Sequence, residues 1–285
     1  EAQQLTSIAE LRAAVAVSAD AELSKRLSQS LYVGAATREL ALLQCGGTLC
    51  LANLAILARE CGYQRLLRKF GGPGRLALRE PLPLQELLRL GISDPGSGYD
   101  PEQHAHLDIE ELVGRFAALL TEKAEMLEEY LMFEMAGGKL LSLPNALGLT
   151  SDAGLSFDGL PLFLLRLCTD VDWNEEKACF RSLCCTVANF FVDALLPDEI
   201  EASVDTTTAV NAAVEAGEFE DVALAAAARK KRLRTAGPNT LEGLQWLHET
   251  LRKDGECQCP ASFARDGTLL DLVSLDQLYR IFERC

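Results

Sequence analysis

The stretch YDPEQHAHLDIEELV, residues 99–113, gathers the side chains best suited to metal chemistry. Carboxylates and an imidazole at helical spacing, here Glu102, His104 and Asp108, can converge on a divalent metal ion that activates water against a phosphodiester. The alternative is the start of a helix. Asp108 is a suitable N-cap, and Glu111 follows three residues later as in a capping box. We prefer the helix start.

Ten cysteines offer a second kind of metal chemistry. We find no secretory signal and therefore expect all ten to be reduced thiols, most of them buried as small hydrophobic side chains. Cys257 and Cys259 could chelate a metal ion, but one close pair without a second pair is a weak signal. Cys285 is the last residue. A terminal thiolate is a good soft ligand for Zn²⁺, and the alternative is a frayed end without a role.

The balance of charge limits the kinds of partner. Lys and Arg number 27 against 42 Asp and Glu, a formal net charge of −15. This acidity argues against a grip on duplex DNA, because phosphate binding needs a basic face. No apolar run approaches the ~20 residues that cross a bilayer. We expect the chain to be a fragment of a longer intracellular protein.

The N-terminal part is predicted to mix helices and strands. Residues 5–29 should form two short helices, with Ser7 and Asp20 as N-caps. The next two apolar runs are joined at Gly46-Gly47, which predicts a β-hairpin. A helix should follow and end at Gly71, where glycine suits left-handed geometry. GRLALREP is then a predicted strand and PLQELLRLGI a short helix.

From Asp108 onward the helical pattern is clear. Apolar residues recur at three- and four-residue spacing as far as Leu131, which predicts one long helix. GGKLLSL is a predicted strand, and the apolar run GLPLFLLRLC is, by its length, partly strand. WNEEKACFRSLCCTVANFFVDALL should form a second long helix, with Asp172 or Asn174 near its start. Two more helices are expected in residues 239–285. The fold class is therefore α+β (mixed α/β).

A change in composition marks residues 197–238. Eight acidic residues and no Lys or Arg lie between Asp198 and Asp221, and RKKRLR follows at Arg229–Arg234. We predict a mobile inserted loop. The basic cluster is either a nuclear import signal or a solvated charge run that neutralises its acidic neighbour.

Several stretches, taken in order, resemble one family. They are LREPLPLQELLRLGISDPGSGY, LTEKAEMLEEYL, DGLPLFLLRLCTDVDWNEEKACFRSL and the ending LDQLYRIFERC. Together they are similar to the C-terminal domain of the MutL homolog 1 family, the eukaryotic branch of the MutL mismatch-repair proteins. The resemblance fails only in the 197–238 insertion. It implies a MutL C-terminal dimerisation domain, with a dimerisation subdomain and a smaller external subdomain, separated from its ATPase part.

The resemblance also implies partners. Members of the family pair through this domain with a second MutL homologue that carries an endonuclease, in an obligate heterodimer. They also present a groove to short peptide motifs of repair factors such as the mismatch-repair exonuclease. We therefore expect a nuclear protein of DNA mismatch repair with little direct DNA binding and no membrane contact. The residues of the groove cannot be transferred one by one.

The endonuclease motif of the family is Asp-Gln-His-Ala followed by two glutamates. Placed on residues 99–113, the motif would begin at Glu102 in place of the aspartate, and Val113 would stand at the position of its last glutamate. The motif would also follow a Pro- and Gly-rich loop instead of a strand. By resemblance it belongs after the second strand of the hairpin. There Asn53 replaces the aspartate, and Arg59 and Gln64 replace the two glutamates. CQCPASF likewise keeps only the Cys-Pro of the catalytic Cys-Pro-His-Gly-Arg-Pro element. We expect no catalytic residue and no cofactor on the chain alone.

Cys285 is the exception. The resemblance implies that this thiol reaches across the dimer and completes or supports the metal site of the partner, so zinc is expected only at the heterodimer site. The helix SLDQLYRIF should hold this end in place through its apolar residues. Two alternatives are a self-sufficient metal-dependent MutL endonuclease acting as a homodimer and a DNA-clamping module. The missing ligands count against the first and the acidity against the second.

Overall fold

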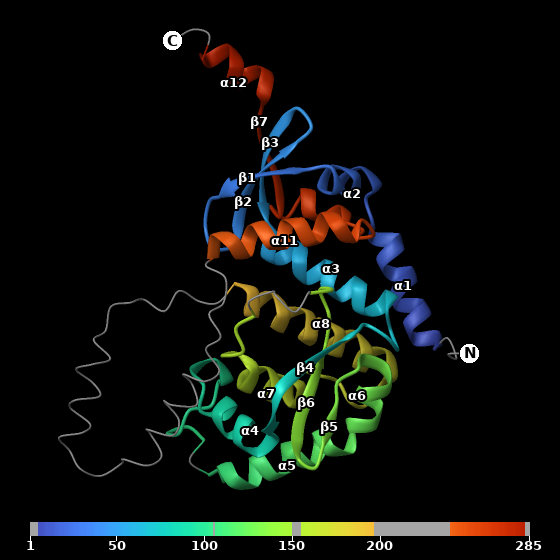
Figure 1. Ribbon diagram of the computed structural model, residues 1–285, viewed down its shortest axis with the longest axis vertical. Coiled ribbons are helices and arrows are strands. Elements are labelled where there is room, and N and C mark those ends of the chain that lie inside the picture. Colours follow the sequence, from blue (N-terminus) through green and yellow to red (C-terminus); the bar gives the residue numbers. More distant parts are fainter. Residues whose placement is uncertain (1–4, 105, 150–154, 197–239, 283–285) are drawn as a thin grey trace, which may run out of the picture.

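The computed structural model describes residues 5–104, 106–149, 155–196 and 240–282. Figure 1 shows two halves along the long axis, each built around an antiparallel β-sheet with helices packed beside it. The predicted mixed α/β fold is confirmed. The 197–238 insertion and its basic cluster lie outside the described residues.

The first sheet has four strands in the order β1-β2-β3-β7. They are β1 (Leu31–Ala35), β2 (Leu40–Cys45), β3 (Thr48–Asn53) and β7 (Leu269–Ser274). The predicted hairpin is confirmed as β2–β3. Its turn is Gly46-Gly47, and Gly46 has a φ of +63°, which glycine adopts without strain. β7 was not predicted from the sequence. Its partner β3 lies far earlier in the chain, so no local hairpin signal marks it.

Four helices belong to this half. They are α1 (Thr6–Ser18), α2 (Ala21–Ser28), α3 (Leu54–Arg68) and α11 (Thr240–Asp254). α11 and α3 contact the sheet, and α1 packs on α3 and α8. α11 contacts β1 and α3, while α3 also packs on α8, so α3 lies between the two halves (Figure 1). Asp20 caps α2 as predicted, accepting from the N–H of Leu23 at 3.0 Å. Ser7 does not cap α1, which begins one residue earlier; its hydroxyl donates to Glu176 instead.

The second sheet has three strands in the order β4-β6-β5. The elements of this half are β4 (Arg75–Pro83), α4 (Leu84–Ile92), η1 (Pro95–Ser97), α5 (Ile109–Glu122), α6 (Ala124–Leu131), β5 (Met135–Ala136) and β6 (Lys139–Pro144). The single long helix predicted from Asp108 is wrong, because the chain breaks at Lys123 into α5 and α6. Leu120 and Leu127 are both fully buried on either side of the break. The apolar spacing therefore continues across it and hides it.

Two helices complete this half, α7 (Leu160–Thr169) and α8 (Glu176–Leu195). The partly strand prediction for GLPLFLLRLC is wrong. α7 is buried on most of its surface, and such a helix carries no periodicity that separates it from a buried strand. α8 is the predicted long helix, and Asp172 and Asn174 lie just before its start as expected. Its N-cap is Glu175, which accepts from the N–H of Ala178 at 3.2 Å.

By length and composition alone, α8 is the one described helix that could cross a membrane. No such run was predicted from the sequence. Eleven residues of α8 are buried, and the helix packs against α1, α3 and α7. This packing identifies α8 as the core helix of a globular fold.

Beyond α11 the chain passes through η2 (Ala261–Ala264) and β7 into α12 (Leu275–Phe282), so both predicted C-terminal helices are present. A capping box starts α12: the N–H of Gln277 donates to Ser274 Oγ at 3.3 Å, and the N–H of Ser274 donates to Gln277 Oε1 at 3.2 Å. α12 extends beyond the β2–β3 hairpin, away from the rest of the molecule (Figure 1).

Candidate functional site

The loop before α5 uses its polar side chains locally. Asp108 Oδ1 accepts from the N–H of Glu110 at 2.9 Å and caps α5. His104 Nδ1 lies 3.0 Å from the backbone oxygen of Asp100, and the His104 ring stacks on Tyr99 with centroids 5.6 Å apart. The helix start preferred from the sequence is confirmed. His104 and Asp108 therefore have structural roles.

The other candidate motif lies where β3 meets α3. Asn53 caps α3, its Oδ1 accepting from the N–H of Ile56 at 3.0 Å. Arg59 forms an ion pair with Asp193 of α8, with Nη2 and Oδ1 2.8 Å apart. Gln64 is buried and bonds to the backbone of Gln258. Each residue at a ligand position of the family motif thus makes a contact that stabilises the fold.

Within the described ranges, no three His, Cys, Asp or Glu side chains are grouped so as to hold a metal ion. Cys285 lies outside the described residues, and its role as a metal ligand stays a prediction. The apolar side chains at the end of α12, from which an anchored terminus was expected, are likewise not described.

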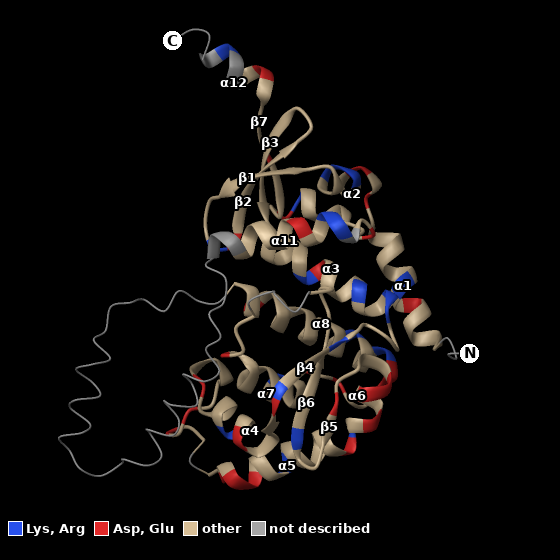
Figure 2. Ribbon diagram, viewed as in Figure 1, with Lys and Arg blue, Asp and Glu red and all other residues tan. Residues whose placement is uncertain are grey.

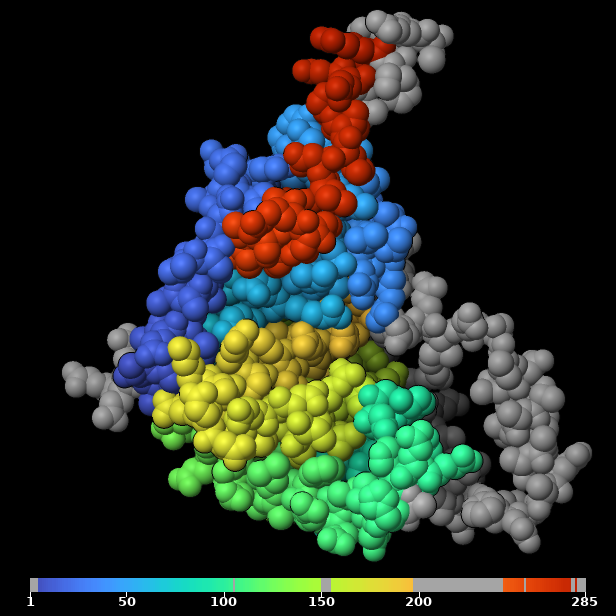
Figure 3. Space-filling model, turned by 180° about the vertical axis from the view of Figure 1, so that it is seen from behind, coloured from blue at the N-terminus to red at the C-terminus, as the bar shows by residue number. Residues whose placement is uncertain are grey.

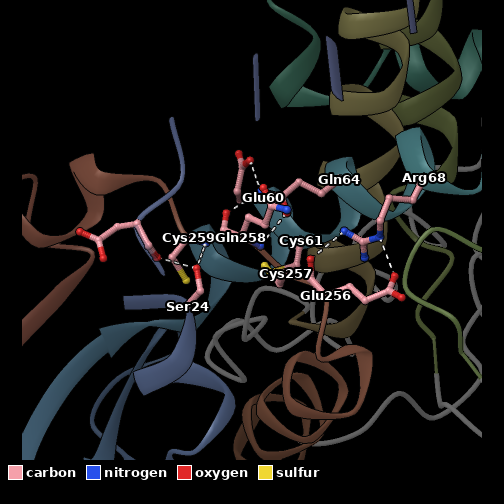
Figure 4. The surroundings of a disulfide bond; sticks show 10 residues. Ser24, Glu60, Cys61, Gln64, Arg68, Glu256, Cys257, Gln258 and Cys259 are labelled. Atoms are coloured by element: carbon pink, nitrogen blue, oxygen red, sulfur yellow. Dashed lines mark hydrogen bonds and ion pairs between the residues drawn. A yellow bond between two sulfur atoms is a disulfide. The ribbon is translucent and has the colours of Figure 1, made fainter. Parts of the chain in front are cut away.

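The prediction that all ten cysteines are reduced is wrong for two of them. Cys61 of α3 and Cys257, just beyond α11, form a disulfide with Cα atoms 5.2 Å apart (Figure 4). The sequence offered Cys257 only as half of a weak chelating pair with Cys259, and it gave no disulfide partner. The true partner is 196 residues away, and only the fold brings it near. The other described cysteines are free and buried or half-buried, as expected.

The four-stranded sheet has one face covered by helices, and the strand register assigns residues to each face. On the covered face Leu43 stands opposite Cys50, and both are fully buried. On the other face Leu42 stands opposite Leu51, which in turn pairs with Leu270. The apolar residues of this second face, called the open face below, are Leu31, Leu40, Leu42, Leu49, Leu51, Leu270 and Val273. Polar Gln44 lies among them, opposite Leu31 and Leu49.

The open face is apolar and accessible to a partner. Leu31 is 51% exposed and Leu270 43% exposed, and the remaining members are half-buried. Of the residues in the four strands, Asp271 alone is charged, and Figure 2 shows these strands almost free of blue and red. A contiguous apolar surface of this kind marks a site of protein interaction.

Polar contacts on the covered side hold β7 at the edge of the sheet. Arg26 of α2 forms an ion pair with Asp271, and Cys50 Sγ donates to Asp271 Oδ1 at 3.4 Å. The hydrogen bond from Arg26 holds the pKa of Asp271 below its usual range, while burial raises the pKa of Cys50 to about 12. Cys50 is therefore a protonated donor. These contacts leave the open face of β7 free.

Comparison with known proteins agrees with the resemblance. A family model described as the C-terminus of DNA mismatch repair protein Mlh1 matches residues 4–285. The chain is 27% identical to DNA mismatch repair protein Mlh1 of Dictyostelium discoideum, over 99% of this chain and 30% of that protein. It is 24% identical to the putative MutL protein homolog 1 of Schizosaccharomyces pombe, over 99% of this chain and 35% of that protein.

The protein MLH1 of Saccharomyces cerevisiae is 26% identical, over 99% of this chain and 34% of its own length. The chain thus spans between 30% and 35% of the length of these relatives. Because the family model covers nearly every residue, the chain belongs to the family of Mlh1 C-terminal domains of DNA mismatch repair proteins.

Proposed function

We propose that this domain is the non-catalytic part of a mismatch-repair heterodimer, and that its open face binds the corresponding domain of a MutL homologue that carries the endonuclease. The open face is the observation that carries the proposal. It is a largely apolar surface across four strands of a domain from the Mlh1 family, with Gln44 as a polar residue among the leucines.

The free energy gained by burying the leucines of the open face is large enough to support stable association. Removing an exposed leucine side chain from water contributes roughly 1.5–3 kcal/mol. Leu31 and Leu270 lie on the two edge strands, with half-buried leucines of β2 and β3 between them. Burial of several such side chains at once offsets the entropic cost of association. A second sheet with a similar apolar face is the complementary occupant.

The absence of catalysis is part of the same proposal. Asn53, Arg59 and Gln64 occupy the positions of carboxylates in the family motif, and none of them supplies the negatively charged oxygen that a carboxylate would give to a divalent metal beside a phosphodiester. All three are engaged in structural contacts. The domain would support the endonuclease of its partner instead. Cys285 would contribute to the zinc site of that partner from the end of α12.

Two further parts of the proposal come from the family resemblance. One is docking of peptide motifs from repair factors such as the mismatch-repair exonuclease, and the other is location in the nucleus. The rival proposal is a self-sufficient metal-dependent endonuclease acting as a homodimer. The apolar open face fits either kind of dimer. The residues at positions 53–64 favour the heterodimer.

Co-purification tests the proposal. The tagged chain is purified from its own cells, its partner is identified by mass spectrometry, and the mass of the complex is measured by sedimentation. We expect a one-to-one complex with a MutL homologue that carries the Asp-Gln-His-Ala motif. The chain alone should not nick supercoiled DNA in Mn²⁺. A homodimer that nicks DNA without a partner would overturn the proposal in favour of its rival.

A further inference from the structure

One covalent link joins the C-terminal part of the described chain to α3. The disulfide between Cys61 and Cys257 spans a sequence separation of 196 residues. Along the backbone, α11 connects to α8 only through residues 197–239. The disulfide makes a second connection, at the other end of α11. It therefore ties the chain that leads into η2 and β7 to the centre of the molecule.

Residues 256–259, called the junction below, carry the disulfide and several weaker contacts (Figure 4). Gln64 Nε2 donates to the Gln258 oxygen at 2.7 Å, and the Gln258 N–H donates to Gln64 Oε1 at 2.8 Å. The N–H of Cys259 donates to Ser24 Oγ at 2.9 Å. These weaker bonds remain when the disulfide is absent, so its loss loosens the junction without unfolding the domain.

The junction sits at the surface. Figure 3 shows C-terminal residues, in red, seated between the blue N-terminal helices and light-blue α3, with a narrow red extension above them. Glu256 and Gln258 are exposed, and Cys257 is half-buried. Surface segments and edge strands such as β7 open locally more easily than a core does. A cross-link at such a place restrains motion that the core contacts do not.

We infer from this placement that Cys61 and Cys257 form a reversible redox clamp. Oxidation locks the junction, η2 and β7 (together the C-terminal arm, residues 256–274) against α3, and reduction loosens the arm while β1, β2, β3 and the second sheet stay folded. The ligand class is a small thiol with its disulfide, such as glutathione.

The chemistry is thiol–disulfide exchange. A small thiolate attacks Sγ of Cys257, the more accessible partner, and forms a mixed disulfide while Cys61 leaves as a thiolate and takes up a proton. A second small thiolate attacks the mixed disulfide and releases Cys257. One small-molecule disulfide forms for each protein disulfide reduced. The same disulfide drives the reverse reaction, so atoms and electrons balance.

The nearest alternative thiol does not compete. Cys259 is two residues from Cys257 but is buried, and burial raises the pKa of its thiol to about 11. A protonated, inaccessible thiol is a poor nucleophile. Exchange from Cys257 to Cys259 is therefore disfavoured, and the Cys61–Cys257 pairing is retained through oxidation cycles.

The clamp has a consequence for the open face, and this consequence rests on the proposed function. β7 contributes Leu270 and Val273 to that face. When the arm is loosened, Leu270 and Val273 would spend less time in their places on the open face. The reduced domain would therefore bind its partner more weakly. Failure of heterodimer formation would remove this consequence but leave the clamp itself testable on the chain alone.

Redox titration with hydrogen exchange tests the clamp. The chain is equilibrated in glutathione buffers from about −320 to −180 mV, and the state of Cys61 and Cys257 is read by alkylation and mass spectrometry. Amide exchange is followed in the arm and in β4 and β6. The variants are the double substitution Cys61→Ser, Cys257→Ser and, as a control, Cys168→Ser, which removes a free half-buried thiol of α7.

We expect a reversible transition within that range. Reduced wild-type chain and the double variant should exchange arm amides about tenfold faster than oxidised chain, with β4 and β6 unchanged. Cys168→Ser should match wild type in both states. A pair that stays reduced, or stays oxidised, at every potential would overturn the inference. Equal exchange of the arm in oxidised and reduced wild-type chain would also overturn it, without relying on any variant.

Discussion

The side chain of Gln64 and the backbone of Gln258 form a two-bond pair: Nε2 donates to the oxygen at 2.7 Å, and the N–H donates back to Oε1 at 2.8 Å. Gln64 Nε2 also donates to Glu60 Oε1 at 2.8 Å. A family endonuclease would hold a carboxylate at this position. In this chain the amide serves packing, because it supplies the donor that a carboxylate lacks.

Gln64→Glu should therefore destabilise the domain and restore no nuclease. The new carboxylate cannot donate to the Gln258 oxygen and faces the half-buried Glu60, whose pKa burial already raises. We expect a loss of about 2–4 kcal/mol in the free energy of unfolding at pH 7, measured by denaturant titration.

The pH dependence separates charge repulsion from lost bonding in this variant. A carboxyl whose folded pKa is raised destabilises most when it is ionised, so the loss in Gln64→Glu should shrink as pH falls from 7 to 5. Gln64→Ala adds no charge and loses only the bonds, including the one that lowers the pKa of Glu60, so its deficit should shrink less than that of Gln64→Glu over the same pH range. A pH-independent deficit in Gln64→Glu would contradict the repulsion account.

Close packing of α4 on α7 gives a second prediction. A Cβ atom at Gly91 would collide with the backbone oxygen of Pro161 and lie 3.3 Å from Leu165 Cβ. Gly91→Ala should lower the free energy of unfolding by roughly 1–3 kcal/mol, because the helices must separate. Thermal unfolding followed by circular dichroism measures it.

Gly114 of α5 is the matched control, since a Cβ atom there would meet nothing within 4 Å. Gly114→Ala should raise the free energy of unfolding by about 0.5–1 kcal/mol through helix propensity. Equal effects of the two substitutions would show that the α4–α7 contact is looser than described.

His248 of α11 predicts an acid-dependent loss of stability. The side chain is buried, and its Nε2 lies 2.8 Å from Ser30 Oγ, whose hydroxyl donates to the Leu27 oxygen. Burial lowers the pKa of His248 to about 4, against an ordinary value of 6.5. The unfolded chain takes up a proton first as pH falls, so the stability contributed by neutral His248 is lost between pH 6.5 and 4.

We expect this loss to be on the order of 2 kcal/mol in wild type. His248→Gln keeps a donor for Ser30 and does not titrate, so the difference between the two unfolding curves isolates the histidine from the carboxylates that also titrate. Parallel pH profiles for wild type and variant would exclude His248 as the source.

Cys285 gives a prediction for the heterodimer. A serine hydroxyl is a poor zinc ligand at neutral pH, so Cys285→Ser should leave assembly intact and lower bound zinc or nicking activity. Arg284→Ala, which changes the neighbouring charge, is the control and should retain zinc. Metal analysis of the purified heterodimer decides it: full zinc occupancy and full nicking in Cys285→Ser would refute the role in trans.

The sequence predicted elements whose signals are local. The Gly46-Gly47 turn, the Asp108 cap and the Asp20 cap depend on residues a few positions apart, and all three are confirmed. α7 was predicted to be partly strand because a buried helix loses its periodicity. The α5–α6 break at Lys123 was hidden because both helices bury the same stripe.

Contacts between residues far apart in the sequence could not be predicted. The disulfide and the β3–β7 ladder each join parts of the chain that only the fold brings together. The open face was missed for the same reason. One local signal was present in LLDLVS, where Asp271 separates Leu270 from Leu272, but a six-residue run does not reveal which strand it pairs with.

Binding of a MutL partner to the open face can be tested at Leu270 against a matched residue elsewhere on the surface. Leu270 on β7 is 43% exposed, and Leu90 on α4 is 40% exposed in the other half of the molecule. The measurement is the dissociation constant of the heterodimer, by calorimetry, for Leu270→Glu and Leu90→Glu. A carboxylate buried at the interface should weaken binding by at least about tenfold in Leu270→Glu. Leu90→Glu should bind as wild type does. Unchanged affinity in folded Leu270→Glu, or equal weakening in both variants, would contradict the assignment of the open face.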